Sequence, residues 1–452
     1  MSFCKDFAWG AATASYQIEG AAFDDGKGWS VWDVFSRKPG AIKDGFNGDI
    51  ACDHYHLYKT DVQVMKEMGM NAYRFSVSWP RVMPEGTGRV NEKGLDFYDR
   101  LVDELLKNNI TPYVTLFHWD YPYELYKRGG WLNPQSPEWL AEYAKVVVER
   151  LSDRVKNWIT ENEPQCYIGG GHYGGEHAPG LKLDLKDVLL AGHNSLLAHG
   201  KAVQQIRASS KQPCLIGYAP AGWWLWCPKT ASPGDIEAAR KLTFGNPEKN
   251  VSTSAWWMDP VYLGKYPEDG LAGFEPWMPE IGQDDMEIIS QPIDFQGINM
   301  YQAYIAREGA DGKPENVERP KGFDKQAYDW PVIPETLYWG PRFFYERYKK
   351  PVFVTENGMA NVDWVSVDGR VHDPQRIDFL YRYIRELKRA AADGVDIRGY
   401  FVWTLTDNYE WAQGHAQRFG LTHVDFNTQK RTIKDSGYWY RKVIDSNGGI
   451  II

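Results

Sequence analysis

Strand-like segments alternate with helical or mixed segments along the whole 452-residue chain. Eight of them are rich in Val, Ile, Phe, Tyr, Trp and Thr, which is typical of strands buried in a parallel sheet. The eight segments are residues 7–15, 72–79, 111–119, 155–163, 214–219, 294–301, 352–356 and 397–405. This alternation predicts an α/β fold.

Amphipathic helices are predicted between these segments. Tyr58, Val62 and Met65 recur at i, i+4 and i+7, and Gly69 stands where a C-terminal cap is expected. Comparable apolar faces fall within residues 95–105, 140–151 and 377–387. Each such face has to pack against another layer, which here is the predicted sheet.

Eight strands with intervening helices fit a single (β/α)8 TIM barrel that takes in residues 1–452 as one domain. A doubly wound sheet is the alternative, but residues 15–20, after the first strand, are not the phosphate loop which that fold needs. Two connections, 220–293 and 302–351, exceed the length of about 15 residues beyond which loops are usually functional. We expect them to be long βα-loop insertions at the C-terminal face, where such barrels hold their active sites.

Charge, cysteine and histidine patterns argue against several functional classes. The net charge is −9, and no basic tract predicts binding to nucleic acid or to a membrane surface. Five scattered cysteines without Cys-x-x-Cys spacing argue against a disulfide framework and a zinc site. His54/His56 and His193/His199 lack metal-ligand spacing, so no metal or cofactor is expected. Without a charged signal region or an apolar run of about 18 residues, a cytoplasmic protein is expected, and a homo-oligomer is left open.

Two short peptides carry the catalytic signal. Residues 160–164 read Thr-Glu-Asn-Glu-Pro and residues 354–358 read Val-Thr-Glu-Asn-Gly, which places Glu163 and Glu356 where two predicted strands end. Two carboxylates fixed on one rigid scaffold are what the cleavage of a glycosidic bond requires. Either peptide alone could be a turn, because Asn, Gly and Pro are common turn residues. Their shared position at strand ends favours a catalytic pair.

Further polar and aromatic side chains stand at the same ends of the predicted strands. Amides, an imidazole, carboxylates and indoles around one cavity suit a sugar, which presents hydroxyls together with an apolar C–H face. The additional candidates are Gln17, Arg74, His118, Trp119, Asn162, Asn299, Tyr301, Trp403, Glu410 and Trp411. For Trp403, an ordinary core position is the alternative.

With these motifs in place, the chain resembles glycoside hydrolase family 1, the β-glucosidase family, over essentially its whole length. The matching segments are residues 7–20, 117–120, 160–164, 299–301, 355–358, 406–411 and 418–421. The resemblance implies a retaining exo-β-glucosidase that removes terminal non-reducing β-D-glucosyl residues, with galactosyl and fucosyl residues left open. Small-molecule β-glycosides and short oligosaccharides, such as those from cellulose degradation, are the expected substrates.

The resemblance also implies roles for individual residues. Glu356 matches the nucleophile, and Glu163 matches the acid/base that first protonates the leaving oxygen and then activates water. Arg74 and Tyr301 match positions beside the nucleophile, where a cation and a phenol favour its ionised form. Asn162 matches the contact to the sugar 2-hydroxyl. The other implied substrate-binding residues are Gln17, His118, Trp119, Asn299, Tyr301, Trp403, Glu410 and Trp411.

Two comparisons with family patterns bear on the substrate. Relatives that act on 6-phosphorylated sugars carry Ser, Lys and Tyr where this chain has Glu410, Gln417 and Phe419, so an unphosphorylated glycoside is predicted. Many members have Trp after Asn-Glu-Pro, where this chain has Gln165. The aromatic contact to the leaving group is therefore expected from the rim, at Trp223, Trp224, Trp226, Trp330 or Trp339.

Two other functions are alternatives to hydrolysis. A catalytically silent sugar-binding barrel is disfavoured because both glutamates are present. A glycosyl transferase would share every catalytic residue, so transglycosylation at high substrate concentration stays open.

Overall fold

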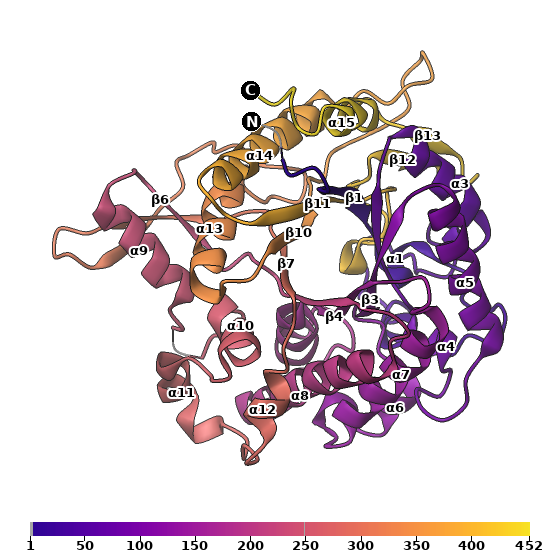
Figure 1. The fold of residues 1–452 in the computed structure, drawn as a ribbon, viewed down its shortest axis with the longest axis horizontal. Coiled ribbons are helices and arrows are strands. Elements are labelled where there is room, and N and C mark those ends of the chain that lie inside the picture. The colour runs from indigo at the N-terminus through magenta and orange to yellow at the C-terminus, as the bar shows by residue number, and fades with distance from the viewer. Residues whose placement is uncertain (1–2, 248) are drawn as a thin grey trace.

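The computed structural model describes residues 3–247 and 249–452. Eight parallel strands form a closed barrel in the order β1-β11-β10-β7-β5-β4-β3-β2 (Figure 1). They are β1 (Ala8–Ala12), β2 (Ala72–Ser76), β3 (Thr111–Phe117), β4 (Asn157–Asn162), β5 (Leu215–Ala219), β7 (Phe295–Asn299), β10 (Val352–Asn357) and β11 (Ile397–Trp403). Each lies within or almost coincides with a predicted segment, and the predicted (β/α)8 barrel is confirmed.

Helices surround the barrel. The longer ones are α3 (His54–Glu67), α5 (Glu92–Lys107), α7 (Ser136–Leu151), α8 (Leu185–Ser209), α9 (Pro233–Phe244), α10 (Ser254–Leu263), α13 (Thr336–Tyr348), α14 (Pro374–Ala392) and α15 (Asp435–Asp445). In α5, the predicted apolar face is buried, while Glu92, Lys93 and Arg100 are exposed. After α3, Gly69 has φ +69°, the left-handed geometry that ends helices and that glycine adopts without strain.

Shorter helices and strands lie mostly in the βα connections. They are α1 (Ser15–Ile18), α2 (Val31–Phe35), α4 (Trp79–Val82), α6 (Tyr123–Lys127), η1 (Gly130–Leu132), η2 (Gln165–Gly174), β6 (Trp226–Pro228), α11 (Glu268–Phe274), η3 (Glu275–Trp277), α12 (Asp285–Ile289), β8 (Tyr304–Glu308), β9 (Pro314–Val317), η4 (Trp411–Gln413), β12 (Thr422–Val424) and β13 (Arg431–Ile433). Strands β6, β8 and β9 form a separate small sheet beside α9, outside the barrel (Figure 1). The two long connections therefore contain their own sheet as well as the outer helices α10 and α13.

Aromatic rings fill the barrel interior beneath the C-terminal strand ends. Tyr113 of β3 lies with its ring centroid 5.0 Å from that of Phe401 and 5.7 Å from that of Phe353, on strands across the barrel. Phe353 in turn contacts Phe295 of β7 at 4.8 Å. The barrel is thus a packed core and not a pore, as is usual for this architecture. This ring layer supports the polar residues above it.

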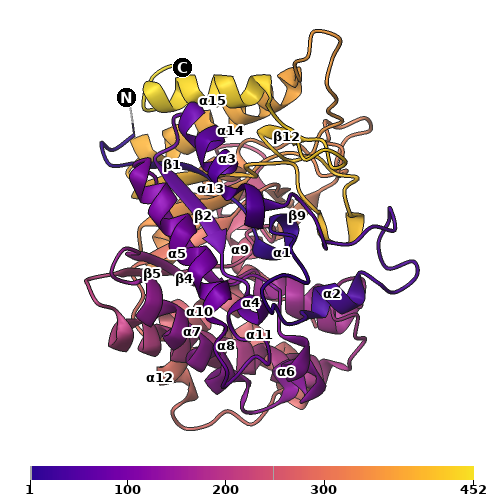
Figure 2. The same ribbon diagram turned by 90° about the vertical axis from the view of Figure 1, so that its right-hand side faces the viewer.

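The two ends of the chain meet on the side of the barrel where α14 and α15 pack (Figures 1 and 2). Asn447 donates from its amide to the carbonyl of Phe3 at 2.8 Å, and its Oδ1 accepts from Trp9 of β1. Within residues 3–247 and 249–452, no helix has both the length and the apolar character needed to cross a membrane.

Candidate active site

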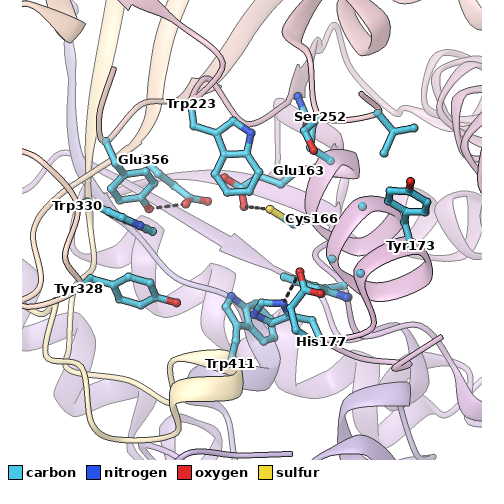
Figure 3. Close-up of a pocket in the computed structure, with 18 of the residues that line it drawn as sticks. Glu163, Cys166, Tyr173, His177, Trp223, Ser252, Tyr328, Trp330, Glu356 and Trp411 are labelled. Atoms are coloured by element: carbon cyan, nitrogen blue, oxygen red, sulfur yellow. Dashed lines mark hydrogen bonds and ion pairs between the residues drawn. The ribbon is translucent and has the colours of Figure 1, made fainter. Parts of the chain in front are cut away.

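A cavity of about 420 Å³ lies at the C-terminal ends of the barrel strands (Figure 3). Its size is within the usual range for small-molecule sites. Its walls include His118, Trp119, Glu163, Tyr301, Glu356, Trp403, Glu410 and Trp411. The other predicted site residues, Gln17, Arg74, Asn162 and Asn299, are buried behind these walls and hydrogen-bond to them. The fold therefore brings all twelve candidates together.

A bulge at the end of β4 brings Glu163 into the cavity. Between Ile159 and Asn162 the strand advances three residues, while its partner β5 advances only two. Thr160 and Glu161 both hydrogen-bond to side chains of α8, outside the barrel. Asn162 and Glu163 consequently both face inward, although strict alternation would separate them. Glu163 also has φ +46°, a strained backbone conformation of the kind that clusters at functional sites.

Glu356 follows a second bulge, in β10. Its Oε1 accepts from Arg74 at 2.8 Å, and its Oε2 accepts from the Tyr301 hydroxyl at 2.7 Å. Arg74 also donates to Oδ1 of Asn162 at 2.6 Å and thereby links the ends of β2, β4 and β10. The Glu356 carboxylate is thus buried, oriented from both oxygens and paired with a cation.

Glu163 has a different set of partners. Its Oε1 accepts from the Asn299 amide at 3.0 Å, and its Oε2 accepts from the Cys166 thiol at 3.2 Å (Figure 3). Both donors are neutral. Burial raises the pKa of Glu163, and these two hydrogen bonds lower it only in part.

Burial raises the pKa of both carboxyl groups, and that of Glu356 rises to about 8. Burial, and then the charge of Glu163, raise the pKa of Glu356, whereas Arg74 and Tyr301 lower it. When Glu163 holds the proton, its repulsion disappears and the cation and phenol still favour ionised Glu356. The reverse assignment would leave Arg74 beside a neutral acid. The geometry therefore favours an ionised Glu356 and a protonated Glu163.

The cavity wall holds a third buried carboxyl group, that of Glu410. Its Oε2 accepts from the Gln17 amide at 3.1 Å, and burial raises its pKa to about 8. Near it, His118 Nε2 lies 2.9 Å from the Asn162 amide, which makes this nitrogen the acceptor and places the ring proton on Nδ1. Among the described residues, Nδ1 of His118 and Oε1 of Gln17 have no hydrogen-bond partner. Buried polar atoms of this kind call for a ligand or water to bond them.

Aromatic rings enclose the remaining walls. Trp403 stacks near His118 with ring centroids 5.9 Å apart, and Trp119 lies 5.0 Å from Trp411. Trp119 and Trp411 have φ +78° and +46°, so strained backbone occurs at these two cavity residues as well as at Glu163. The Trp119 indole donates to the carbonyl of Ala178 and is thereby held in place.

Some cavity residues were not singled out as site residues from the sequence. Cys166, Tyr173 and Tyr328 line the cavity, together with residues 249–252. Of the five rim tryptophans, Trp223 and Trp330 line it. Trp224, Trp226 and Trp339 instead pack around β6 and α13. The tryptophan-rich composition signalled the rim but did not show which rings face inward.

The glycine-rich segment 169–174 corrects one expectation. Its Gly-x-Gly-x-x-Gly pattern, away from a first strand, predicts a loop near the pocket rim and not a dinucleotide site, but the segment belongs to the wide helix η2. Pro164 immediately precedes this helix with helical φ and ψ, and a proline is well suited to such a start because its missing N–H needs no partner there. Gly169, Gly170 and Gly174 do line the cavity, as the expected rim position implied.

Comparisons with known proteins agree with this site. The model of glycosyl hydrolase family 1 matches residues 1–449. β-Glucosidase A of Thermotoga maritima is 45% identical over 99% of this chain and 98% of its own length. An aryl-phospho-β-D-glucosidase of Bacillus subtilis is 40% identical over 99% of this chain and 98% of its own length. The solved structure of the T. maritima β-glucosidase in complex with glucoimidazole matches with a TM-score of 0.90 at 46% identity, covering 99% of both chains. The resemblance seen in the motifs is thus confirmed, and the chain belongs to glycosyl hydrolase family 1.

Proposed function

We propose that this glycosidase is a retaining, exo-acting β-glucosidase for unphosphorylated β-D-glucosides, with residues 1–452 acting as one catalytic domain. One observation supports the assignment most strongly. Glu356 and Glu163 line the same cavity, but only the first has both a cation and a phenol as hydrogen-bond donors among the described residues. Two carboxyl groups with opposed protonation are what double displacement requires.

The proposed reaction uses these two states in sequence. Glu356 attacks the anomeric carbon, and the bond to the leaving oxygen breaks as Glu163 supplies the proton. A water molecule then attacks the anomeric carbon of the resulting glucosyl ester and gives a proton to Glu163, while the bond to Glu356 breaks and restores its carboxylate. Two inversions give net retention. Asn162, which is held by Arg74 and His118, is the proposed contact to the 2-hydroxyl.

The glucosyl ring is proposed to lie over Trp403, between the nucleophile and the wall formed by Glu410 and Gln17. The unpartnered atoms on Gln17 and His118 would bond sugar hydroxyls. A 6-phosphate would instead meet the buried Glu410 and the Phe419 ring, neither of which offers a positive charge. Burying a dianion without a cation is costly, so the phosphorylated sugar is disfavoured.

A substrate panel tests the proposal. Initial rates on aryl β-glucoside, β-galactoside, β-fucoside and 6-phospho-β-glucoside would be compared, and proton NMR would identify the first anomer released. We expect the phosphorylated sugar to react at least about 100-fold more slowly than the glucoside, with β-glucose as the first product. First release of α-glucose would contradict retention. A faster phosphorylated substrate, or no turnover on any sugar, would overturn the substrate assignment.

Because Cys166 donates a hydrogen bond to Glu163, two substitutions of Cys166 should shift the pH dependence of kcat/KM in opposite directions. A hydroxyl is a stronger donor than a thiol, so Cys166→Ser should stabilise ionised Glu163 and lower its pKa. Cys166→Ala removes the donor and should raise that pKa. The alkaline limb of kcat/KM should move to lower pH in the first variant and to higher pH in the second.

The control for this series is Cys214→Ser. Cys214 is partly buried like Cys166, but its sulfur accepts a hydrogen bond from the exposed Arg207 and it does not line the cavity. Its substitution should leave the profile unchanged. Shifts of the same sign in both Cys166 variants would show that the thiol does not act through this hydrogen bond.

A further inference from the structure

Gln165 forms a two-point clamp on the connection after β5. Its amide Nε2 donates to the carbonyl of Ala221 at 3.0 Å, and the Ala221 N–H donates back to its Oε1 at 3.1 Å. Gln165 is only 1% exposed, so its polar atoms must find protein partners. The clamp joins the segment that directly follows Glu163 to the segment that leads into Trp223.

Strand β7 holds the same connection from the other side. The Gly222 N–H donates to the carbonyl of Asn299 at 2.7 Å, and a Cβ on Gly222 would lie 2.8 Å from Cγ2 of Ile298. This contact leaves no room for a side chain at position 222. The side chain of Asn299 also donates to Glu163, so one residue of β7 connects to both the acid/base and the Trp223 segment.

The Trp223 ring therefore occupies a defined place in the cavity. Trp223 lines the same cavity as Glu163, and the two side chains project into it near one another in Figure 3. Gly169, Gly170 and Gly174 of η2 line the cavity on the same side as Ser252 and Tyr173, and they contribute no side chains of their own. On this side the cavity is therefore lined by the Trp223 indole and by backbone without side chains.

We propose that Trp223 is the aromatic platform for the leaving group and that Gln165 is a positioning residue which holds it there. The inference rests on the proposed function, because the group that Glu163 protonates has to lie on the Glu163 side of the cleaved bond. It deepens that function by assigning the residue that contacts the leaving group, which in the proposed substrates is an aryl ring or a second sugar. Both present a flat apolar face to an indole.

The test compares two substrates that share the glucosyl group. Phenyl-type β-glucosides carry a ring in the leaving group, whereas β-glucosyl fluoride carries none. Trp223→Ala should lower kcat/KM for the aryl glucoside and cellobiose by about tenfold, the scale of one aromatic contact. The same variant should change kcat/KM for glucosyl fluoride by less than about twofold.

Gln165→Met tests the clamp, because Met is similar in size and forms neither amide hydrogen bond. Gln165→Met should reproduce the ring-selective loss of Trp223→Ala, that is, a fall in kcat/KM for aryl glucosides and cellobiose without a comparable fall for glucosyl fluoride. If Gln165 acts through Trp223, the double variant should lose no more on aryl glucosides than Trp223→Ala alone. If Gln165 had only a structural role, Gln165→Met would lower kcat/KM for the aryl glucoside and for glucosyl fluoride equally. Its loss would then add to that of Trp223→Ala in the double variant.

Trp224→Phe is the matched control. Trp224 lies in the same segment but packs against Trp226, and it does not line the cavity. It should show no ring-selective loss. Equal losses on aryl glucoside and glucosyl fluoride in Trp223→Ala would overturn this inference alone. Failure of the wild type on both substrates would overturn the proposed function as well.

Discussion

Glu356→Ala is expected to lose roughly 10⁵-fold or more in kcat on aryl β-glucosides, a scale on which removal of a catalytic nucleophile acts in other enzymes. The physical reason is that no other group can form the covalent glucosyl intermediate once this carboxylate is gone. Arg74 and Tyr301 would remain, but they would face an empty space. Steady-state rates at saturating substrate give the measurement.

Azide separates loss of the nucleophile from loss of folding. In Glu356→Ala, azide can enter the space left by the carboxylate and displace the leaving group directly, giving α-glucosyl azide. Rescue with this product would identify Glu356 as the nucleophile. β-Glucosyl azide, or inactivity with an unchanged folded structure and no rescue, would contradict the assignment.

Glu163→Ala should show a loss that depends on the leaving group. For cellobiose, whose leaving oxygen needs a proton, kcat/KM should fall by about 10⁴-fold, the upper range for general acid catalysis. For 2,4-dinitrophenyl β-glucoside, whose phenolate leaves without a proton, kcat/KM should change little. Azide should then accelerate turnover by attacking the glucosyl ester on Glu356, giving β-glucosyl azide.

Glu161→Gln provides the matched control for this variant. Glu161 is two residues away on the same strand, but its carboxyl group accepts from Tyr167 and Ser195 outside the cavity. Glu161→Gln should leave the ratio of kcat/KM for cellobiose to that for 2,4-dinitrophenyl β-glucoside at the wild-type value. A uniform loss across all substrates in Glu163→Ala would contradict the acid/base role.

Much of the fold was predictable from local pattern. Buried parallel strands are continuous apolar runs and amphipathic helices have a 3.6-residue period, so the eight barrel strands and several helices could be read directly. Segment 169–174 was misread because glycine is a poor helix former. Here the helix begins directly after Pro164 and packs against α8, so a tertiary contact accompanies a helix that local propensity does not predict.

The barrel, the family and the twelve candidate site residues follow from the amino-acid sequence alone, because strand periodicity and short motifs are local properties. Why Glu161 and Glu163 point in different directions is visible only in the folded chain. Both lie in one peptide, and a bulge in β4 sends the first toward α8 and the second into the cavity. Likewise, only the folded chain shows that Trp223 lines the cavity while its neighbour Trp224 packs against Trp226. Bulges and long-range hydrogen bonds depend on contacts between distant segments, so no local pattern reveals which side chain they turn inward.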